Sequence, residues 1–465
     1  MPANDTAAAP LPSDFRREME SLFVVEEASR LFAALDGDAI PVSLRVNPLK
    51  PPAVLPAPQE GRVPWCGAGV YLATRPRFTH DPLLHAGCYY VQEAASMFVE
   101  QAYRRIAADF TPRRVLDLCA APGGKSTLWR SLLPDGTLLV ANEPVRQRAQ
   151  ILAENLTKWG HPDVVCTSAY PEEFAPLAGF FDVVAADVPC SGEGMFRKDK
   201  ASRAEWSAEA VESCAARQRD IVASVWPALR GGGYLVYSTC TFNRAENEDN
   251  VRHICRELGA ECVAVECDPA WGVTGDVTGG GLPVARFLPH YTKGEGLFLA
   301  LLRKTGDTPV PRVRKARKSG GGTPHPRGVA AAAALVSPSA DYDIISAAGG
   351  MLAAVRRTLS ADVARVRAAV RTLTEGVALV EEKGRKLVPQ HALALSACLT
   401  EGAFAMAELD EENALRYLRR ESLTLTAAVP HGYVLAAYRG RPLGFLNNLG
   451  ARANNLYPAE WRVRF

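Results

Sequence analysis

The stretch that most constrains the fold of this chain is residues 115–127, VLDLCAAPGGKST. Its apolar start predicts a buried strand of a parallel sheet, with Asp117 near the carboxyl end. The turn at 122–124 contains two glycines, which adopt backbone angles that other residues resist. A helix expected at about 125–133 would direct its free N–H groups at a ligand above the strand ends, where open α/β sheets bind their ligands.

Residue spacing excludes two common phosphate-binding turns. A Walker A loop needs a glycine five residues before Gly124, and Cys119 occupies that position. The dinucleotide pattern G-x-G-x-x-G is also absent from the turn. What remains is a strand, a turn and a helix, with Glu143 about twenty residues beyond the glycines, where a second strand end meets a ribose hydroxyl. The spacing therefore favours an adenosine-containing ligand over a nucleoside triphosphate.

Length and composition indicate a multidomain globular protein. The 465 residues correspond to about three domains, and 48% hydrophobic with 22% charged residues is ordinary for a soluble chain. The net charge is only +2, so any contact with nucleic acid would come from local patches. We find neither a signal peptide nor an apolar run of the ~18 residues that a membrane span needs.

Cysteine usage indicates a reducing, cytoplasmic environment. The chain has 11 cysteines without the dense spacing of a disulfide scaffold. Cys255, Cys262 and Cys267 lack the spacing of metal ligands, so we expect no metal site.

Changes in composition divide the chain into five segments. We expect a disordered tail at 1–12, a small substrate-side domain at 13–105, a catalytic domain at 106–304, a basic flexible linker at 305–330 and a C-terminal region at 331–465. The last segment would end in a compact α+β module at about 387–465. The linker could contact phosphates or be merely solvated, through its basic residues Arg312, Arg314, Lys315, Arg317 and Lys318.

Strands and helices alternate from Val115 to about Arg303, which is typical of a doubly wound α/β sheet. Strands are expected at 115–118, 137–142, 164–167, 182–187, 234–238 and 297–303. Helices are expected at 145–159, 208–229 and 246–258, with a turn at 231–233. Elsewhere we expect helices at 15–35 and 89–103, a strand within 42–50, loops at 50–61 and 69–87, a largely helical 340–384 and a hairpin at 433–446.

Two cysteines follow neighbouring strands at the predicted ligand-binding edge of the sheet. DVPCSGEG (187–194) places Cys190 just beyond a strand that ends at Asp187, and YSTCTFNRAENE (237–248) places Cys240 just beyond the next strand. Many cysteines are simply small buried hydrophobes, but functional residues of this fold collect at strand ends. We therefore expect these three residues to converge with the Gly-rich turn on one site.

These motifs resemble the three signatures of the Sun-domain RNA cytosine-5 methyltransferases, which use S-adenosylmethionine. LRVNPLK and YYVQEAASM are similar to the family's N-terminal elements. LVPQHALAL and LGFLNNLGARANNLYPAEWRVRF resemble the PUA-like module of bacterial members that modify small-subunit ribosomal RNA. The resemblance implies a Rossmann-like, S-adenosylmethionine-dependent methyltransferase core with a small N-terminal RNA-binding domain and a C-terminal PUA-like α+β module.

The resemblance also implies roles for individual residues. Cys240 matches the cysteine that attacks cytosine C6, and Cys190 the one that assists loss of the C5 proton and release of the base. Asp187 would hold the base edge near the cofactor, Lys125 would orient the base or the cofactor carboxylate, and Glu143 would bind the ribose. The methionine part of the cofactor would be held by Cys119, Ala120, Ala121, Pro122, Gly123, Gly124 and Lys125. A free thiol is mostly protonated at neutral pH, and the sequence does not show what activates Cys240.

Three positions depart from the family pattern. Val188 replaces the usual alanine, and Asn447 stands where relatives often carry lysine in the C-terminal module. No carboxylate occupies 168–170, where some members have a cofactor ligand.

The function expected from the sequence is C5 methylation of a cytosine in small-subunit (16S) ribosomal RNA by a cytoplasmic, monomeric enzyme without membrane contact. The alternatives are a transfer-RNA cytosine-5 methyltransferase and a non-catalytic ribosome-assembly factor that binds RNA. The presence of both Cys190 and Cys240 argues against the assembly factor. A DNA cytosine methyltransferase would use the Pro-Cys cysteine as its nucleophile and would not need Cys240.

Overall fold

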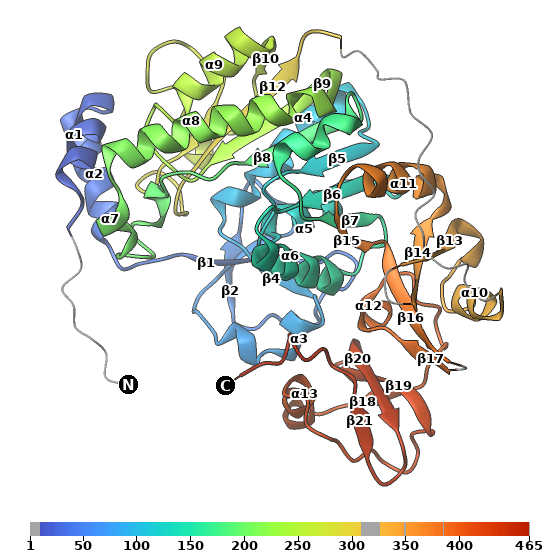
Figure 1. Ribbon diagram of the computed structural model, residues 1–465. Helices are drawn as coiled ribbons and strands as arrows, with labels where there is room; N and C mark the ends of the chain where they lie inside the picture. Colours follow the sequence, from blue (N-terminus) through green and yellow to red (C-terminus); the bar gives the residue numbers. More distant parts are fainter. Residues whose placement is uncertain (1–9, 308–325, 348–349, 385, 465) are drawn as a thin grey trace.

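The computed structural model describes residues 10–307, 326–347, 350–384 and 386–464. A nine-stranded sheet lies at the centre of this part of the chain, in the order β10-β12-β9-β8-β5-β6-β7-β15 with β11 paired to β12 (Figure 1). Its strands are β5 (Arg114–Asp117), β6 (Leu138–Asn142), β7 (Val164–Thr167), β8 (Phe181–Asp187), β9 (Leu229–Thr239), β10 (Ala260–Val263), β11 (Ala285–Phe287), β12 (Leu297–Lys304) and β15 (Thr372–Glu375). Strands β5 to β9 are parallel, and their order reverses between β5 and β8, the kind of switch point where such sheets bind ligands.

Helices cover both faces of the central sheet. One apolar core lies against α4 (Val99–Asp109), α5 (Gly124–Leu132) and α6 (Arg146–Trp159), and a second lies against α8 (Ala208–Val225) and α9 (Glu248–Leu258). The central strands are mainly apolar because both faces are buried, as in β6, where all five residues are buried and four are apolar. The architecture confirms the expected Rossmann-like α/β fold.

The N-terminal part combines two helices with a separate four-stranded sheet, order β2-β3-β1-β4. Its elements are α1 (Ser13–Leu22), α2 (Val25–Asp36), β1 (Val42–Val46), β2 (Gln59–Arg62), β3 (Gly69–Leu72), α3 (Pro82–His85) and β4 (Tyr89–Val91). The prediction of a loop at 69–87 is therefore wrong, since β3 lies within it. A strand of four residues is too short to show an alternating pattern in the sequence. The helix predicted at 89–103 begins as β4, which pairs with β1, and becomes α-helical only at α4.

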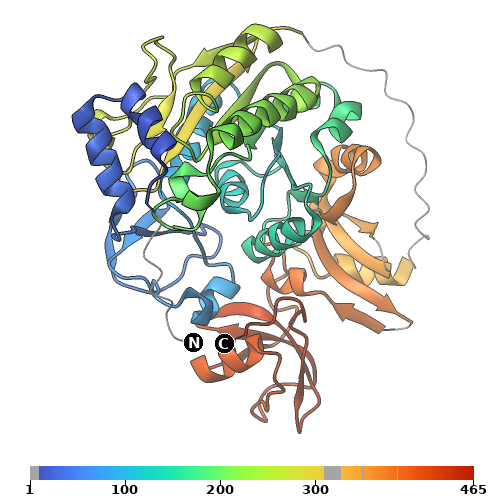
Figure 2. The same ribbon diagram turned by 60° about the vertical axis from the view of Figure 1, so that its left-hand side comes forward.

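Two further four-stranded sheets follow the catalytic part. The first, order β13-β14-β16-β17, contains β13 (Tyr342–Ser346), β14 (Met351–Arg356), β16 (Val377–Lys383) and β17 (Lys386–Pro389), with α10 (Pro326–Ala333), α11 (Ser360–Ala369) and α12 (His391–Leu395) beside it. The second contains β18 (Met406–Glu408), β19 (Gly432–Tyr438), β20 (Arg441–Asn448) and β21 (Ala453–Asn455), with α13 (Glu411–Leu418). Figure 2 shows this last sheet beneath the N-terminal part, with which it shares an apolar core.

The C-terminal half also corrects several local predictions. Residues 340–384 contain more strand than helix, and α11 is the only α-helix among the described residues of this range. One of these strands, β15, pairs with β7 and so extends the central sheet from outside 106–304. The turn expected at 231–233 lies within β9, where Gly232 has a φ of 69°. The hairpin at 433–446 is confirmed, and it turns through Arg439 and Gly440, both with positive φ.

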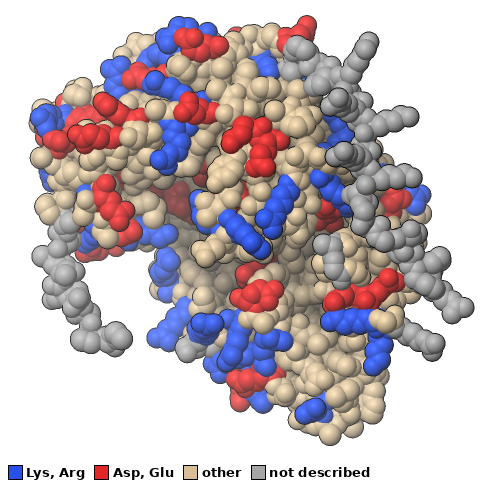
Figure 3. Space-filling model, viewed as in Figure 1, with Lys and Arg blue, Asp and Glu red and all other residues tan. Residues whose placement is uncertain are grey.

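Two predicted segments lie largely outside the described residues. These are the tail at 1–12 and the basic linker at 305–330, including Arg312, Arg314, Lys315, Arg317 and Lys318. Within the described ranges, every helix is too short or too polar to span a bilayer. Figure 3 shows that Lys and Arg mix with Asp and Glu over much of one face, in keeping with the small net charge.

Candidate active site

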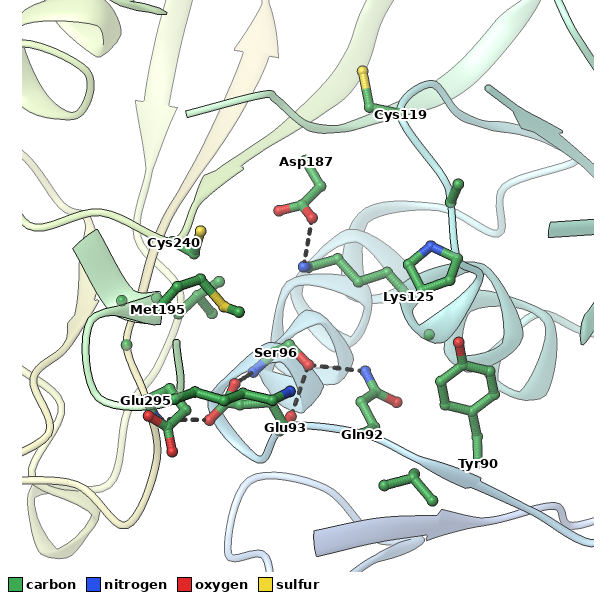
Figure 4. Close-up of a pocket in the computed structure, with 18 of the residues that line it drawn as sticks. Tyr90, Gln92, Glu93, Ser96, Cys119, Lys125, Asp187, Met195, Cys240 and Glu295 are labelled. Carbon is green, nitrogen blue, oxygen red and sulfur yellow. Dashed lines mark hydrogen bonds and ion pairs between the residues drawn. The ribbon is translucent and has the colours of Figure 1, made fainter. Parts of the chain in front are cut away.

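A cavity of about 310 Å³ lies at the carboxyl ends of the parallel strands (Figure 4). The turn before α5 and the ends of β8 and β9 form one side, and β4 with the following η2 segment (Ala95–Phe98) forms the other. The predicted site residues that line it are Cys119, Ala120, Ala121, Pro122, Gly124, Lys125, Asp187 and Cys240. Gly123, Glu143 and Cys190 do not line it.

The glycines of the turn are required by its geometry. Gly123 caps α5 with a φ of 116°, a left-handed conformation that favours glycine. A Cβ placed on Gly124 would lie 3.3 Å from the Tyr90 ring, so this residue must be small for the turn to approach β4. The turn thereby brings the N-terminus of α5 to the cavity, where its free N–H groups favour a negatively charged ligand group.

Lys125 and Asp187 form an ion pair in the cavity, with 2.8 Å between the Lys125 Nζ and an Asp187 carboxylate oxygen. Ser238 donates a hydrogen bond of 2.8 Å to the other carboxylate oxygen, which fixes the orientation of Asp187. Burial alone would lower the pKa of Lys125, but the charge of Asp187 and the hydrogen bond to it outweigh burial and raise this pKa. The cavity therefore holds a fixed ammonium group, and its field also acts on Cys240.

The two predicted cysteines are in contact, with 3.1 Å between their sulfur atoms. Both are free thiols and half-buried, but only Cys240 lines the cavity, while Cys190 lies behind it. The backbone N–H of Cys240 also points at the Cys190 sulfur, at 3.4 Å. The hydrogen bond with Cys240, together with burial, raises the pKa of the Cys190 thiol well above its usual range. Cys190 is therefore a neutral thiol at physiological pH.

Buried carboxylates that the sequence analysis did not select hold the two cysteine loops together. Glu193 accepts hydrogen bonds from the backbone N–H groups of Phe242 and Asn243, at 2.6 and 3.0 Å. Glu246 accepts one from the backbone of Ser191 at 3.1 Å. Both glutamates are fully buried. The cysteine motifs contain these residues, but their pairing across 50 residues of chain has no signature in the sequence.

Glu143 follows β6 as predicted, but its carboxylate faces its own loop. It accepts a hydrogen bond of 3.0 Å from the backbone N–H of Val145 and lies 3.4 Å from the Arg148 guanidinium. The residue is 1% exposed. Arg148 in turn donates to the backbone carbonyl of Ala121, at 3.1 Å, in the turn at 119–124 that precedes α5 (the cofactor turn). A ribose contact by Glu143 stays a prediction, and it would require Arg148 to move or to share the carboxylate.

The N-terminal sheet supplies a wall of the site that sequence reasoning missed. Arg45, on β1, is fully buried and donates to the Gln92 side chain at 2.9 Å and to the Thr127 hydroxyl of α5 at 2.6 Å. Gln92 lines the cavity and donates to Ser96, which also lines it. The motifs LRVNPLK and YYVQEAASM contain these residues, so the available signal was an arginine between the apolar residues Leu44 and Val46.

One cluster of possible metal ligands lies elsewhere, formed by Asp135, His161 and Asp163. Arg356 makes ion pairs with both carboxylates, at 2.8 Å from Asp163 and 3.6 Å from Asp135. The arginine supplies the positive charge that a cation would provide, so this cluster is explained as an ion-pair network that joins β14 to the central sheet.

Family models match three parts of the chain. The model of 16S rRNA methyltransferase RsmB/F matches residues 109–303, that of the N-terminal domain of 16S rRNA methyltransferase RsmF matches 11–94, and that of the methyltransferase RsmF PUA domain matches 405–463. These matches cover the catalytic part, the N-terminal part and the last sheet described above. They confirm the family that the motifs indicate and its cofactor, S-adenosylmethionine.

Individual relatives match nearly the whole chain. The ribosomal RNA small subunit methyltransferase F of Erwinia tasmaniensis is 31% identical, with 97% of this chain and 96% of the relative covered. That of Klebsiella pneumoniae is 33% identical, with 90% and 89% covered.

Among solved structures, a methyltransferase homologue of Pyrococcus horikoshii shares the fold with a TM-score of 0.53, 24% identity and coverage of 63% of this chain and 95% of that one. NSun6 of the same organism, solved with SFG, has a TM-score of 0.53, 21% identity and coverage of 64% and 99%. Because the sequence relatives align with this chain almost from end to end, the chain belongs to the family of ribosomal RNA small subunit methyltransferases F.

Proposed function

We propose that this protein methylates C5 of a cytosine in small-subunit ribosomal RNA, with S-adenosylmethionine as the methyl donor and a covalent bond between Cys240 and C6 as the intermediate. The observation that carries the proposal is the contact of the two cysteine sulfurs, 3.1 Å apart, at a cavity that also holds the Lys125–Asp187 pair. Cytosine C5 is a poor nucleophile, and addition of a thiolate to C6 is the step that activates it.

The cavity suits the methyl donor. Its volume of about 310 Å³ is within the range of small-ligand sites. The turn at 119–124 would hold the methionine part of the cofactor. Lys125 would neutralise either the cofactor carboxylate or the carboxylate of Asp187, with which it forms an ion pair. S-adenosylmethionine supplies an electrophilic methyl group on a sulfonium, a good leaving group.

Attack on the base is assigned to Cys240, because it lines the cavity and Cys190 does not. A positive charge in the same cavity, on Lys125, would support attack by this sulfur. As the sulfur bonds to C6, the π electrons of the C5–C6 double bond move to C5, and N3 takes up a proton from water beside Asp187. C5 then bonds to the methyl carbon as the methyl–sulfonium bond breaks, and S-adenosylhomocysteine leaves.

Release is assigned to Cys190. The proton on C5 must leave before the C5–C6 double bond can re-form and the C6–S bond can break, with loss of the proton from N3. The largest contribution to the raised pKa of Cys190 is its hydrogen bond with Cys240. That interaction weakens once the Cys240 sulfur is a thioether, so Cys190 can then give its proton to water and accept the one from C5.

The RNA would be held by patches of positive charge. In Figure 3, Lys and Arg gather on α6 and near α3 and α13, on either side of a hollow. Exposed examples are Arg146 on α6, Arg77 before α3 and Arg420 after α13. Contacts with phosphates here would hold the RNA without binding the target base. The base would then have to leave its stack, and this unstacking costs a few kcal/mol in a duplex.

Two alternatives from the sequence lead to different observations. A transfer-RNA enzyme would have the same site, so only the identity of the methylated RNA separates the two. A non-catalytic assembly factor would not need two thiols in contact beside a lysine–aspartate pair. A nucleophile at Cys190, as in DNA enzymes, would require attack by the sulfur that does not line the cavity, past the Cys240 sulfur that does.

The test uses three variants of the full chain, incubated with small-subunit RNA and S-adenosylmethionine. Cys190→Ala should attack and methylate but not release, giving a slow-migrating RNA adduct on a denaturing gel, whereas Cys240→Ala should give none. The double variant should behave like Cys240→Ala, because release cannot matter before attachment.

Cys214→Ala, which removes a half-buried cysteine of α8, serves as the control and should turn over normally. Nucleoside mass spectrometry should find 5-methylcytosine only where the parent chain or this control is present. An adduct with Cys240→Ala instead of Cys190→Ala would reverse the two roles, and adducts with neither would contradict the covalent mechanism.

A further inference from the structure

Cys190 and Cys240 are in contact but have different proposed roles, and the charged groups around the two thiols also differ. On the cavity side, the Lys125 ammonium interacts with Cys240. Beside Cys190, the next residue in the chain, Ser191, donates its backbone N–H to Glu246, at 3.1 and 3.3 Å from the two carboxylate oxygens. A positive group therefore lies in the cavity that Cys240 lines, and a negative group is bonded to the residue that follows Cys190.

Glu246 is a buried carboxylate that the reaction itself does not use. It is fully buried and does not line the cavity. Besides Ser191, the Gln218 amide donates to one of its oxygens at 2.6 Å and the Asn243 amide to the other at 2.8 Å. Burial raises the pKa of Glu246 above its usual value, and the hydrogen bonds from Ser191 and Asn243 offset only part of this rise. The groups bonded to its two oxygens are all N–H groups, which can only donate, so the ionised form is the one that fits the site.

We propose that Glu246 is a positioning residue that keeps Cys190, the thiol that does not line the cavity, protonated while Cys240 attacks the base. The inference rests on the proposed function and deepens it. A negative charge next to Cys190 disfavours a second negative charge there. Glu246 itself forms and breaks no covalent bond.

The other titratable groups at Cys190 do not oppose this assignment. Cys240, at the end of β9, is the hydrogen-bond partner itself. Tyr237, on β9, donates its hydroxyl to the Glu246 backbone carbonyl at 2.6 Å, and burial raises its pKa well above the usual range, so it is neutral. Glu246 thus provides the negative charge on this side of the pair.

The test measures the ionisation of Cys190 directly. In full-length Cys240→Ala, alkylation of Cys190 by iodoacetamide is followed against pH, with the labelled peptide quantified by mass spectrometry. Adding Glu246→Gln, which keeps the shape and removes the charge, should lower the midpoint by about one pH unit, a tenfold larger thiolate fraction below it. This pH profile does not depend on methyl transfer, so it can succeed or fail independently of the proposed function.

Glu193→Gln in the same background is the matched control, because Glu193 is equally buried and also bridges the two cysteine loops. It should leave the midpoint near that of Cys240→Ala. Glu246→Asp retains the charge and should do the same. An unchanged midpoint in Glu246→Gln, an equal shift in Glu193→Gln, or an equal shift in Glu246→Asp would each overturn the proposal, since each assigns the effect to packing and not to this charge.

Discussion

Arg45 joins the N-terminal sheet to the helix that begins at the cofactor turn, and its removal should weaken cofactor binding from outside the cavity. Its guanidinium donates to the Gln92 side chain at 2.9 Å, to the Thr127 hydroxyl at 2.6 Å and to the Gly124 carbonyl at 3.2 Å. It also lies 4.5 Å from the centre of the Trp159 ring. Burial lowers the pKa of Arg45 to about 10, so the side chain is still charged at neutral pH.

The size of the effect follows from these contacts. Hydrogen bonds to a charged group contribute about 1.5–3 kcal/mol each, and a desolvated cation–π contact about 2 kcal/mol, but these values are not additive. For Arg45→Met we expect a loss of about 3–5 kcal/mol in the free energy of unfolding, because several buried neutral acceptors lose their donor, at about 1–3 kcal/mol each and not additively. Because two of these bonds hold the first turn of α5, about 1.4 kcal/mol of this should appear as a tenfold weaker Kd for S-adenosylhomocysteine.

Isothermal titration calorimetry with S-adenosylhomocysteine, beside a thermal melt, measures both quantities. Arg45→Lys keeps the charge but not the planar fork, so it should fall between the parent and Arg45→Met. Arg77→Met, at an exposed position near the same sheet, should change neither. If Arg45→Met lowers the melting temperature while the Kd stays within twofold, the arginine stabilises the fold without organising the cofactor turn, and this reasoning is refuted.

Three other predictions concern the site and its pH dependence. S-adenosylhomocysteine at 100 times its Kd should stabilise the chain by about 2.7 kcal/mol in a thermal melt, and ATP should not; the reverse would contradict the adenosine-ligand assignment. Burial raises the pKa of Asp117 to about 7, so the folded chain holds a proton that the unfolded chain releases above about pH 4. Stability from this group therefore falls as pH rises from about 4 to 7, and Asp117→Asn should gain stability relative to the parent between pH 5 and pH 8; a constant difference in urea midpoints would refute this. A Cβ on Gly194 would lie 2.7 Å from the Cys240 carbonyl oxygen, so Gly194→Ala should slow adduct formation at least about tenfold. Gly306→Ala, where the Cβ meets no atom within 4 Å and φ is not positive, should leave it unchanged.

The catalytic core could be predicted in detail because its signals are local. The strands from β5 to β9 each contain a short apolar run, and burial on both faces of a parallel sheet requires that pattern. The turn before α5 is indicated by Gly123, whose φ of 116° is unfavourable for other residues. Order along the chain and the handedness of crossover connections then place the ends of β8 and β9 on one edge of the sheet.

Short strands outside the core could not be predicted in the same way. β15, with the sequence TLTE, is polar at alternate positions and joins β7 about 200 residues earlier in the chain. Its pairing depends on an exposed sheet edge that exists only in the folded protein. The same applies to β3 and β4, which are stabilised by β1 between them.

By itself, the sequence determined the fold class, the ligand-binding edge of the sheet and the two cysteines that share it, because each depends on patterns within about ten residues. Only the tertiary structure decided which cysteine faces the cavity, that the sulfurs are 3.1 Å apart, that Lys125 lies in the same cavity and that Glu246 is bonded to the residue after Cys190. It also placed Arg45 beneath the cofactor turn, 79 residues from Gly124 along the chain. Hydrogen bonds and charge interactions act over a few ångströms in space whatever the distance along the chain, so their partners are set by how the strands and helices pack, which local sequence patterns do not encode.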